Sequence, residues 1–507
     1  MEGEAEAIRR LSSTRTVATS AMWNLIGRAG PLVVAVVITP FLVRDLGPSR
    51  WGVFTIALSL VGIFSIFDFG IGRSLTRAIA ELLTEGKRED AASIARSGMA
   101  ALTVLGIAGG LVMASLARYW VDAGLHISPA LHNEVLNSLY LLCLSAPIVI
   151  LCSALWGVIG AFQEFRAANL VNIPVMAMYY IGPLIALHFR NSLVPVIGVL
   201  VLCRVVSTFA YWRICLRALP ELKHARMDLA KLRPVLRMGG WMTASNITWP
   251  ILTYVDRFII ASVLSAAATG YYSTPFDLVM RFTIVPVAIM STAYPAMAAS
   301  YRNDPENTQA LFRRSLVTVA GALFLPCLLC VALSHWVLTL WLGADFASHA
   351  SVVLRWLGVG ILLTSIDSVV GGLLDGIGKA SVNAKFSIVE LVLYLPLLTL
   401  LVRKTGIEGA AIAWALRCSI DLGLRLWIAQ RIYVPLRPVA LRLSPLLVGM
   451  SGTLLLTALA QGTALVPAIA GGGALLVLVL GWRSLTHSER SRLSAGAGRL
   501  VPRRQGA

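Results

Sequence analysis

The sequence predicts an all-α polytopic membrane protein, with about fourteen transmembrane helices in two related six-helix lobes and a C-terminal helix pair. Three observations lead to this fold class: the composition, the length of the apolar runs and an internal repeat. Hydrophobic residues make up 57% of the 507 residues and charged residues only 13%. A soluble protein carries about twice that charged fraction.

The apolar runs are long enough to cross a membrane. A helix needs about 20 residues to span the roughly 30 Å hydrocarbon core of a bilayer. The sequence contains fourteen such stretches, at about 17–40, 52–72, 97–117, 135–159, 168–188, 194–214, 239–263, 270–294, 315–338, 351–374, 383–402, 409–429, 441–460 and 465–482.

The second half of the chain repeats the first. Residues 52–97 align without a gap with residues 270–315, at a constant offset of 218. Farther along, Asn169 aligns with Asn383 and Arg204 with Arg417, at offsets of 214 and 213. Identities are few, so the repeat rests on matched hydropathy and turn positions. Two related helix bundles with a substrate site between them are typical of a secondary transporter.

Basic residues predict the orientation in the membrane. The net charge is +18, and 30 of the 43 Lys and Arg residues lie on the side of the N-terminus, against six on the opposite side. By the positive-inside rule both termini are cytoplasmic. This explanation of the basic charge requires no nucleic acid.

The same pattern predicts the division of the chain. We expect a cytosolic lead at 1–16, an N-lobe at 17–214 and a basic cytoplasmic linker at 215–238, then a C-lobe at 239–430, a helix pair at 431–483 and a basic, disordered cytosolic tail at 484–507. The linker suits either a helix on the membrane surface or a solvated charged connection.

No pattern typical of an enzyme occurs. The seven cysteines lie in or beside apolar spans, where they are expected to pack as small hydrophobic residues. The histidines form no HExxH-type pair, and the sequence has no phosphate-binding G-x-x-x-x-G-K-[ST] loop. We therefore expect no catalytic activity, no cofactor and no metal.

Ionisable residues inside the spans are the candidate functional residues. An arginine at the centre of a membrane helix costs roughly 2.5–3.5 kcal/mol, so it must be paired or line a wet cavity. The spans hold seven arginines and six acids, a near balance that leaves structural pairing open: Arg28, Arg204, Arg257, Arg281, Arg355, Arg417, Arg425, Asp68, Asp256, Asp277, Asp367, Glu390 and Asp421.

Spacing separates local pairing from ligand binding. Asp277 and Arg281 are four residues apart on one helix face and can pair, and the series Arg417, Asp421 and Arg425 has the same spacing. Asp256 and Arg257 are adjacent and therefore point to different faces of their helix, so they do not satisfy each other locally.

Arg28 and Arg204 have no acid in their own spans and most need an outside partner, which an anionic ligand would supply. Asn24 precedes Arg28 by one turn, and Asn246 has the corresponding place in the second half, on one face with Arg257. Interhelical hydrogen bonding without a ligand is the alternative. The candidate substrate-binding residues are Asn24, Arg28, Arg204, Asn246, Arg257, Arg281 and Arg417. The candidates for cation coupling or gating are Asp68, Asp256, Asp367 and Glu390.

Several segments resemble a known family. They are SAMWNLIGRAG before residue 31, LGPSRWGVFTIALSL from Leu46, FDFGIG at Phe67–Gly72, GGWMTASN at Gly239–Asn246 and GIEGAAIAWAL at Gly406–Leu416. Over residues 16–482 the chain is similar to the Wzx-type polysaccharide flippases of the multidrug/oligosaccharidyl-lipid/polysaccharide exporter superfamily.

The resemblance implies two lobes that work by alternating access in the bacterial inner membrane. The implied activity is translocation of a polyprenyl-diphosphate-linked oligosaccharide from the cytoplasmic to the outer leaflet. Membrane lipids and a polysaccharide polymerase are the implied partners. A dianionic diphosphate suits arginine, which is always charged and binds phosphate with a fork of donors.

Three alternatives stay open. A cation-coupled multidrug exporter of the same superfamily relies on acids in its lobes, which Asp68, Asp256, Asp367 and Glu390 could supply. A lipid II flippase of this superfamily also has fourteen helices. A membrane scaffold without transport activity is the third alternative, and the repeat and the buried charge argue against it.

Overall fold

The computed structural model describes residues 14–228, 232–460 and 464–484, with side chains from residue 32 onward except those of 65, 123, 232–246, 482 and 484. Within this part of the chain every regular element is a helix, and ten helices are long and apolar enough to cross a membrane. The predicted class, an all-α polytopic membrane protein, is confirmed.

The helices of the first half precede residue 229. They are α2 (Thr14–Phe64), η1 (Ser65–Asp68), α3 (Ile71–Thr84), α4 (Arg88–Tyr119), η2 (Trp120–Gly124), η3 (Pro129–Leu131), α5 (His132–Leu144), α6 (Ala146–Ala161), α7 (Phe165–Phe189), α8 (Leu193–Ala218) and η4 (Pro220–Lys223).

The remaining helices begin at residue 232. They are α9 (Leu232–Val263), α10 (Ala266–Met280), η6 (Arg281–Thr283), α11 (Ile284–Ser300), α12 (Pro305–Ala332), α13 (Ser334–Leu342), α14 (Ala344–Gly376), α15 (Ala380–Ile432), η7 (Val434–Leu436), α16 (Arg437–Leu459) and α17 (Val466–Ser484).

All fourteen predicted spans fall on these helices, but two pairs of spans run on through a kink. Span 17–40 continues into span 52–72 within α2, which kinks at Gly47 with φ of 71°. Spans 383–402 and 409–429 are joined in α15, which kinks at Gly406 with φ of 67°. Glycine adopts a positive φ without a steric penalty, so the chain turns at these residues while the helices on either side continue.

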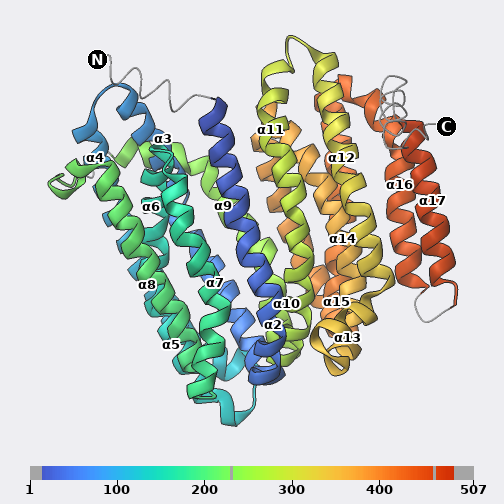
Figure 1. The fold of residues 1–507 in the computed structure, drawn as a ribbon, viewed down its shortest axis with the longest axis horizontal. Coiled ribbons are helices and arrows are strands. Elements are labelled where there is room, and N and C mark those ends of the chain that lie inside the picture. Colours follow the sequence, from blue (N-terminus) through green and yellow to red (C-terminus); the bar gives the residue numbers. More distant parts are fainter. Residues whose placement is uncertain (1–13, 229–231, 461–463, 485–507) are drawn as a thin grey trace, which may run out of the picture. The chain divides into compact units, whose positions relative to one another are not determined.

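The described residues divide into two compact units. Unit 1 comprises residues 1–274 and 384–410, and unit 2 comprises 275–383 and 411–507, as far as they are described. In unit 1, α7 packs on α2 and α8, and α6 packs on α3, α4 and α8 (Figure 1). Apolar side chains from these helices fill its core, with Phe54, Leu75, Leu102 and Leu155 at most 2% exposed.

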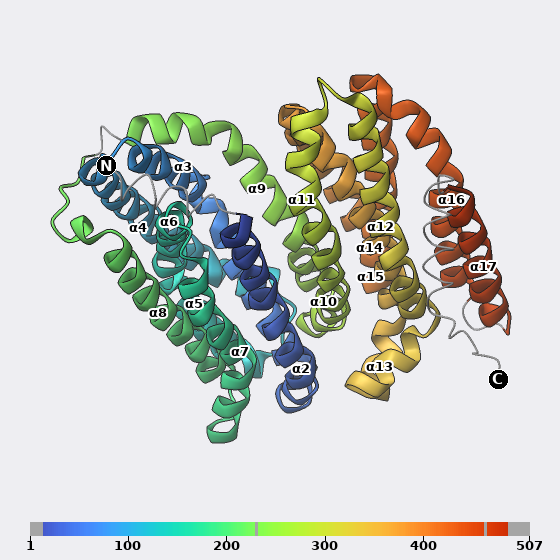
Figure 2. The same cartoon turned by 45° about the horizontal axis from the view of Figure 1, so that its top comes forward.

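Unit 2 is built around α14, which packs on α11, α12, α13 and α16. The C-terminal helices α16 and α17 lie side by side as an antiparallel pair, drawn in red in Figures 1 and 2. Helix α12 begins at a well-formed cap, because Asp304 accepts a hydrogen bond from the Asn307 amide at 3.0 Å and Pro305 occupies the first turn.

The lobe boundaries expected from the sequence stay a prediction.

The start of the predicted linker is a connection tied to α4. After α8 ends, residues 219–228 form the short turn η4 and irregular chain. Arg88 donates a hydrogen bond to Glu221 at 2.8 Å, and Ser93 donates one to the carbonyl of Arg226 at 2.9 Å. The bond from Arg88 lowers the pKa of the Glu221 carboxyl. These contacts hold residues 219–228 against α4, and the two alternatives for the linker stay open.

Candidate substrate site

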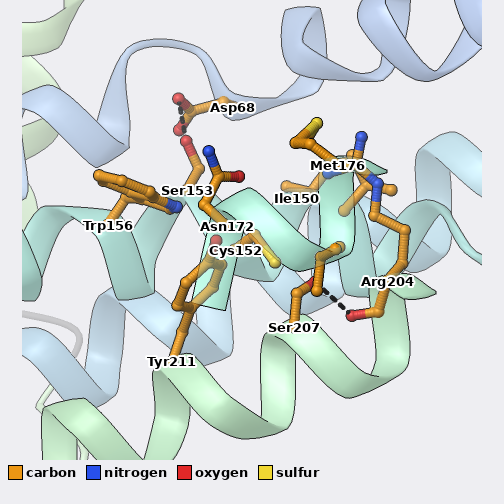
Figure 3. A pocket seen from close by; sticks show the side chains of 12 residues that line it. Asp68, Ile150, Cys152, Ser153, Trp156, Asn172, Met176, Arg204, Ser207 and Tyr211 are labelled. Atoms are coloured by element: carbon orange, nitrogen blue, oxygen red, sulfur yellow. Dashed lines mark hydrogen bonds between the residues drawn. The ribbon is translucent and has the colours of Figure 1, made fainter. Parts of the chain in front are cut away.

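A cavity of about 260 Å³, lined by both apolar and polar side chains, lies in unit 1 between η1, α6, α7 and α8 (Figure 3). We call it the Asp68–Arg204 cavity. Its wall combines aliphatic and sulfur-containing side chains with polar and aromatic ones, among them Asp68, Ser153, Trp156, Asn172, Arg204 and Tyr211. The polar groups in this wall favour a ligand with polar groups of its own, because lipid tails cannot hydrogen-bond to them.

The FDFGIG segment fixes the carboxyl group of Asp68. The backbone leaves the helix at Phe69 and Gly70, with φ of 48° and 74°, and α3 begins at Ile71. Asp68 accepts a hydrogen bond from the backbone amide of Gly72 at 2.9 Å and another from the Ser153 hydroxyl at 2.7 Å. One carboxyl group thus caps α3 and ties it to α6.

Arg204 and Asn172 supply the remaining strongly polar groups of the cavity. The Arg204 guanidinium lies over the Tyr179 ring, 5.1 Å from its centroid. Among the described residues, neither the Arg204 guanidinium nor the Asn172 amide has a hydrogen-bond or ion-pair partner. The sequence indicated that Arg204 needs a partner from outside its own span, and the structure brings Asp68 from another span to the same cavity.

A second polar cluster in unit 1 surrounds Asp256 and Arg257 of α9. The hydroxyl groups of Tyr272 and Tyr394 donate hydrogen bonds to Asp256 at 2.6 and 2.9 Å. Arg257 donates one to Ser59 of α2 at 2.7 Å. Both α9 residues are almost fully buried, and they have different partners, as their adjacency in the sequence predicted.

A third cluster lies within unit 2. Arg425 of α15 forms a 2.7 Å ion pair with Asp367 of α14, and both side chains are mostly buried. Asn383 donates hydrogen bonds to Asp375 at 2.7 Å and to the carbonyl of Gly371 at 2.9 Å. Asp367, a predicted candidate for cation coupling or gating, is thus held by an arginine on another helix.

The other predicted residues with described side chains lie on η6 and α15. Arg281 starts η6 with an exposed side chain, and within the described structure it forms no ion pair with Asp277. Glu390 and Arg417 are half-buried on α15, in unit 1 and unit 2 respectively. The side chains of Asn24, Arg28 and Asn246 lie outside the described residues, so the predictions for them stay predictions.

Several residues that complete these sites were not predicted from the sequence. Asn172, Trp156 and Tyr211 line the cavity, and Tyr272 and Tyr394 hold Asp256. Asn172 had a usable signal, because it is a carboxamide near the start of an otherwise apolar span. The aromatic residues had none, since tyrosine and tryptophan are common in membrane helices for other reasons.

In the described part of the chain, no group of three or more His, Cys, Asp or Glu residues could hold a metal ion.

Comparison with known families identifies the class of this protein. Residues 17–301, more than half of the chain, match the model of the family described as polysaccharide biosynthesis protein. The chain belongs to this family. A relative named "Putative O-antigen transporter", from Shigella flexneri, is 28% identical over 82% of this chain and 98% of its own length. The lipopolysaccharide biosynthesis protein WzxC of Escherichia coli K12 is 24% identical over 78% of this chain and 77% of its own length.

Solved structures show where the fold of this family member belongs. An inward-facing multidrug resistance MATE family transporter of the MOP superfamily has a TM-score of 0.66 at 14% identity, covering 82% of this chain and 99% of its own. The lipid II flippase MurJ, in an inward closed conformation, has a TM-score of 0.65 at 14% identity, covering 91% and 98%. At this identity the likeness shows the fold alone.

Proposed function

We propose that this protein is a flippase that moves a polyprenyl-diphosphate-linked oligosaccharide from the cytoplasmic to the outer leaflet of a bacterial inner membrane. The observation that carries the proposal is the Asp68–Arg204 cavity, which holds a permanent cation and several other polar groups inside a bundle of apolar helices. A lipid-linked glycan needs such a space, because its sugars and diphosphate must avoid hydrocarbon while its tail stays in it. Membership of the polysaccharide biosynthesis family supports the same cargo.

We assign the diphosphate to arginines of the spans. Arginine keeps its charge at any physiological pH and can bind two phosphate oxygens at once. Arg28 is the first candidate, because the sequence gives it no acid in its own span. Arg281 is exposed on unit 2 and is the second candidate. Arg257 and Arg417 are further candidates.

We propose that the span acids couple or gate transport. Asp256 and Asp367 each bond to side chains from other helices, so a change in their charge would loosen contacts between helices. Asp68 would loosen the α3–α6 contact in the same way. Glu390 is a further candidate.

We expect a polysaccharide polymerase that consumes the translocated unit as the functional partner. We also expect transport by alternating access, with both termini in the cytoplasm.

Replacing Arg28 tests the proposed role of the span arginines. In a strain that lacks the chromosomal gene, we expect Arg28→Ala to lower surface polysaccharide at least tenfold at normal protein levels, because the diphosphate loses a cationic partner. The control is Arg44→Ala on the same helix, at an exposed position, which should restore wild-type amounts. Immunoblotting of surface glycan measures the result, and wild-type amounts in Arg28→Ala would contradict the assignment.

Two further measurements on the deletion strain separate the alternatives. A lipid II flippase that acts alone would be essential for growth, whereas loss of this protein should leave the cells viable. A multidrug exporter would protect cells from dyes and antibiotics, whereas deletion should leave efflux unchanged. Lysis or drug hypersensitivity on deletion would favour the corresponding alternative.

A further inference from the structure

We propose that the Asp68–Arg204 cavity binds one sugar ring of the glycan, rather than the diphosphate. This inference rests on the proposed function and deepens it, because it assigns the sugar and the diphosphate to different residues. Three features of the cavity support it: polar groups with no hydrogen-bond partner among the described residues, two opposite charges in the wall, and the size and aromatic lining.

Polar groups in the cavity are available for a ligand. The Asn172 amide has two N–H donors and one carbonyl acceptor, and none of them bonds to another described residue. The Arg204 guanidinium likewise donates no hydrogen bond to a described residue, and it lies over the Tyr179 ring. Polar groups withdrawn from water cost free energy unless they are hydrogen-bonded, so water or a ligand must complete them.

The charges of the wall select the kind of ligand. In Figure 3 the Asp68 carboxyl group and the Arg204 guanidinium lie on opposite sides of the Asn172 amide. A diphosphate would meet the carboxyl group of Asp68, and a metal cation would meet the guanidinium of Arg204. Sugar hydroxyls both donate and accept hydrogen bonds, so a sugar can donate to Asp68 and accept from Arg204 and Asn172. Each oxygen of the Asp68 carboxyl group accepts one hydrogen bond from the protein. Each can accept another from a ligand.

Size and lining agree with a single ring. The volume of about 260 Å³ is below the range of roughly 300–1,000 Å³ typical of pockets for drug-sized ligands. Trp156 and Tyr211 form part of the wall, with ring centroids 5.6 Å apart and ring planes at 68°. Such aromatic surfaces offer an apolar face for the C–H groups of a sugar ring next to polar partners.

Lipid binding with and without sugar tests the proposal. We would incubate the purified full-length protein with undecaprenyl diphosphate or with the lipid-linked oligosaccharide extracted from its host, and measure both affinities by native mass spectrometry. The wild-type protein should prefer the glycan-bearing lipid. Asn172→Leu should weaken binding of that lipid about five- to tenfold, as expected for the loss of one or two neutral hydrogen bonds. It should leave binding of undecaprenyl diphosphate unchanged.

Two more variants keep the result interpretable. Asn172→Asp has nearly the same shape, so it should fold, and it removes both N–H donors of the amide, so it should weaken the preference for sugar. Asn137→Leu makes the matched substitution at an exposed position on α5, outside the cavity, and should retain wild-type binding.

The outcomes separate the two proposals. A preference for the glycan-bearing lipid that survives both Asn172 substitutions overturns the sugar site and leaves the flippase proposal standing. An equal loss of affinity for both lipids in Asn172→Leu assigns the cavity to the diphosphate and also overturns the sugar site. Failure of the wild-type protein to bind either lipid refutes the proposed function, and the sugar site with it.

Discussion

At the scale of single residues, each hydrogen bond to a carboxyl group buried among membrane helices contributes to the stability of the fold. Asp256 is 1% exposed and accepts bonds from Tyr272 and Tyr394, which belong to two other helices. A buried polar group that loses its partner pays its desolvation cost in full. The two tyrosines therefore join α9, α10 and the first part of α15 within unit 1.

Tyr394→Phe tests this connection. Removing one hydroxyl donor should destabilise the protein by roughly 1–3 kcal/mol, because the carboxyl group it serves has no access to water. Thermal unfolding in detergent, read by tryptophan fluorescence, measures the change. Tyr119→Phe is the matched control, since Tyr119 is 73% exposed and should be neutral. An equal effect of the two substitutions would show that the bond to Asp256 does not contribute.

Sequence patterns identified which residues are chemically unusual but not most of their partners. The spans revealed Asp68, Asp256, Asp367 and Arg204, since charge inside a membrane helix is costly wherever it occurs. The partners Ser153 and Tyr394 are ordinary residues in a span, and only packing brings them into contact. The relation between Asp256 and Arg257 was predictable, because neighbouring residues on a helix point in different directions and therefore face different neighbours.

At the scale of helices, the close approach of α2 and α10 reflects the internal repeat. The alignment pairs Gly52 with Gly270, and the structure places these two glycines against each other within unit 1. A Cβ atom at Gly52 would overlap the carbonyl oxygen of Ala266. Trp51 also donates a hydrogen bond to Thr274 across this crossing, at 2.8 Å. Small residues let membrane helices approach this closely.

Gly52→Ala should disrupt the crossing. The added methyl group meets backbone that cannot move aside, so we expect a loss of at least about 1–3 kcal/mol, the usual cost of overpacking. Gly321→Ala on α12 is the control, because no atom lies within 4 Å of its added methyl group, and alanine favours the helix by about 0.5–1 kcal/mol. Folded yield and melting temperature in detergent report both effects. A Gly52→Ala protein as stable as Gly321→Ala would contradict the tight crossing.

Hydropathy predicted where helices occur better than where they break. All fourteen apolar ranges fall on helices, because a span must satisfy its backbone internally. The breaks at Phe69–Gly70 and between α5 and α6 lie inside predicted spans. A helix can break within the membrane where side chains complete the exposed backbone groups, as Asp68 does for Gly72. That compensation depends on tertiary structure, which hydropathy does not report.

At the scale of the whole molecule, the distribution of charge predicts the orientation of the chain in the membrane. Basic residues gather on the side of the termini, which predicts that this side is cytoplasmic. The repeat gives the two halves related helices, but their span charges differ: Arg204 matches Arg417, whereas Arg28 has no arginine at its repeat position. An asymmetric set of cations suits an anionic lipid that moves one way. The fold class was predictable from these patterns and the cargo class from the family resemblance, whereas the cavity was not.

The leaflet position of the lipid-linked glycan tests the central claim most directly. In spheroplasts of the deletion strain, undecaprenyl-linked repeat units are probed from outside with an impermeant periodate reagent or glycosidase, then again after permeabilisation. We expect these units to accumulate and to react only after permeabilisation, and the wild-type gene to restore reaction from outside. Equal outside reactivity with and without the protein would contradict its function as a flippase.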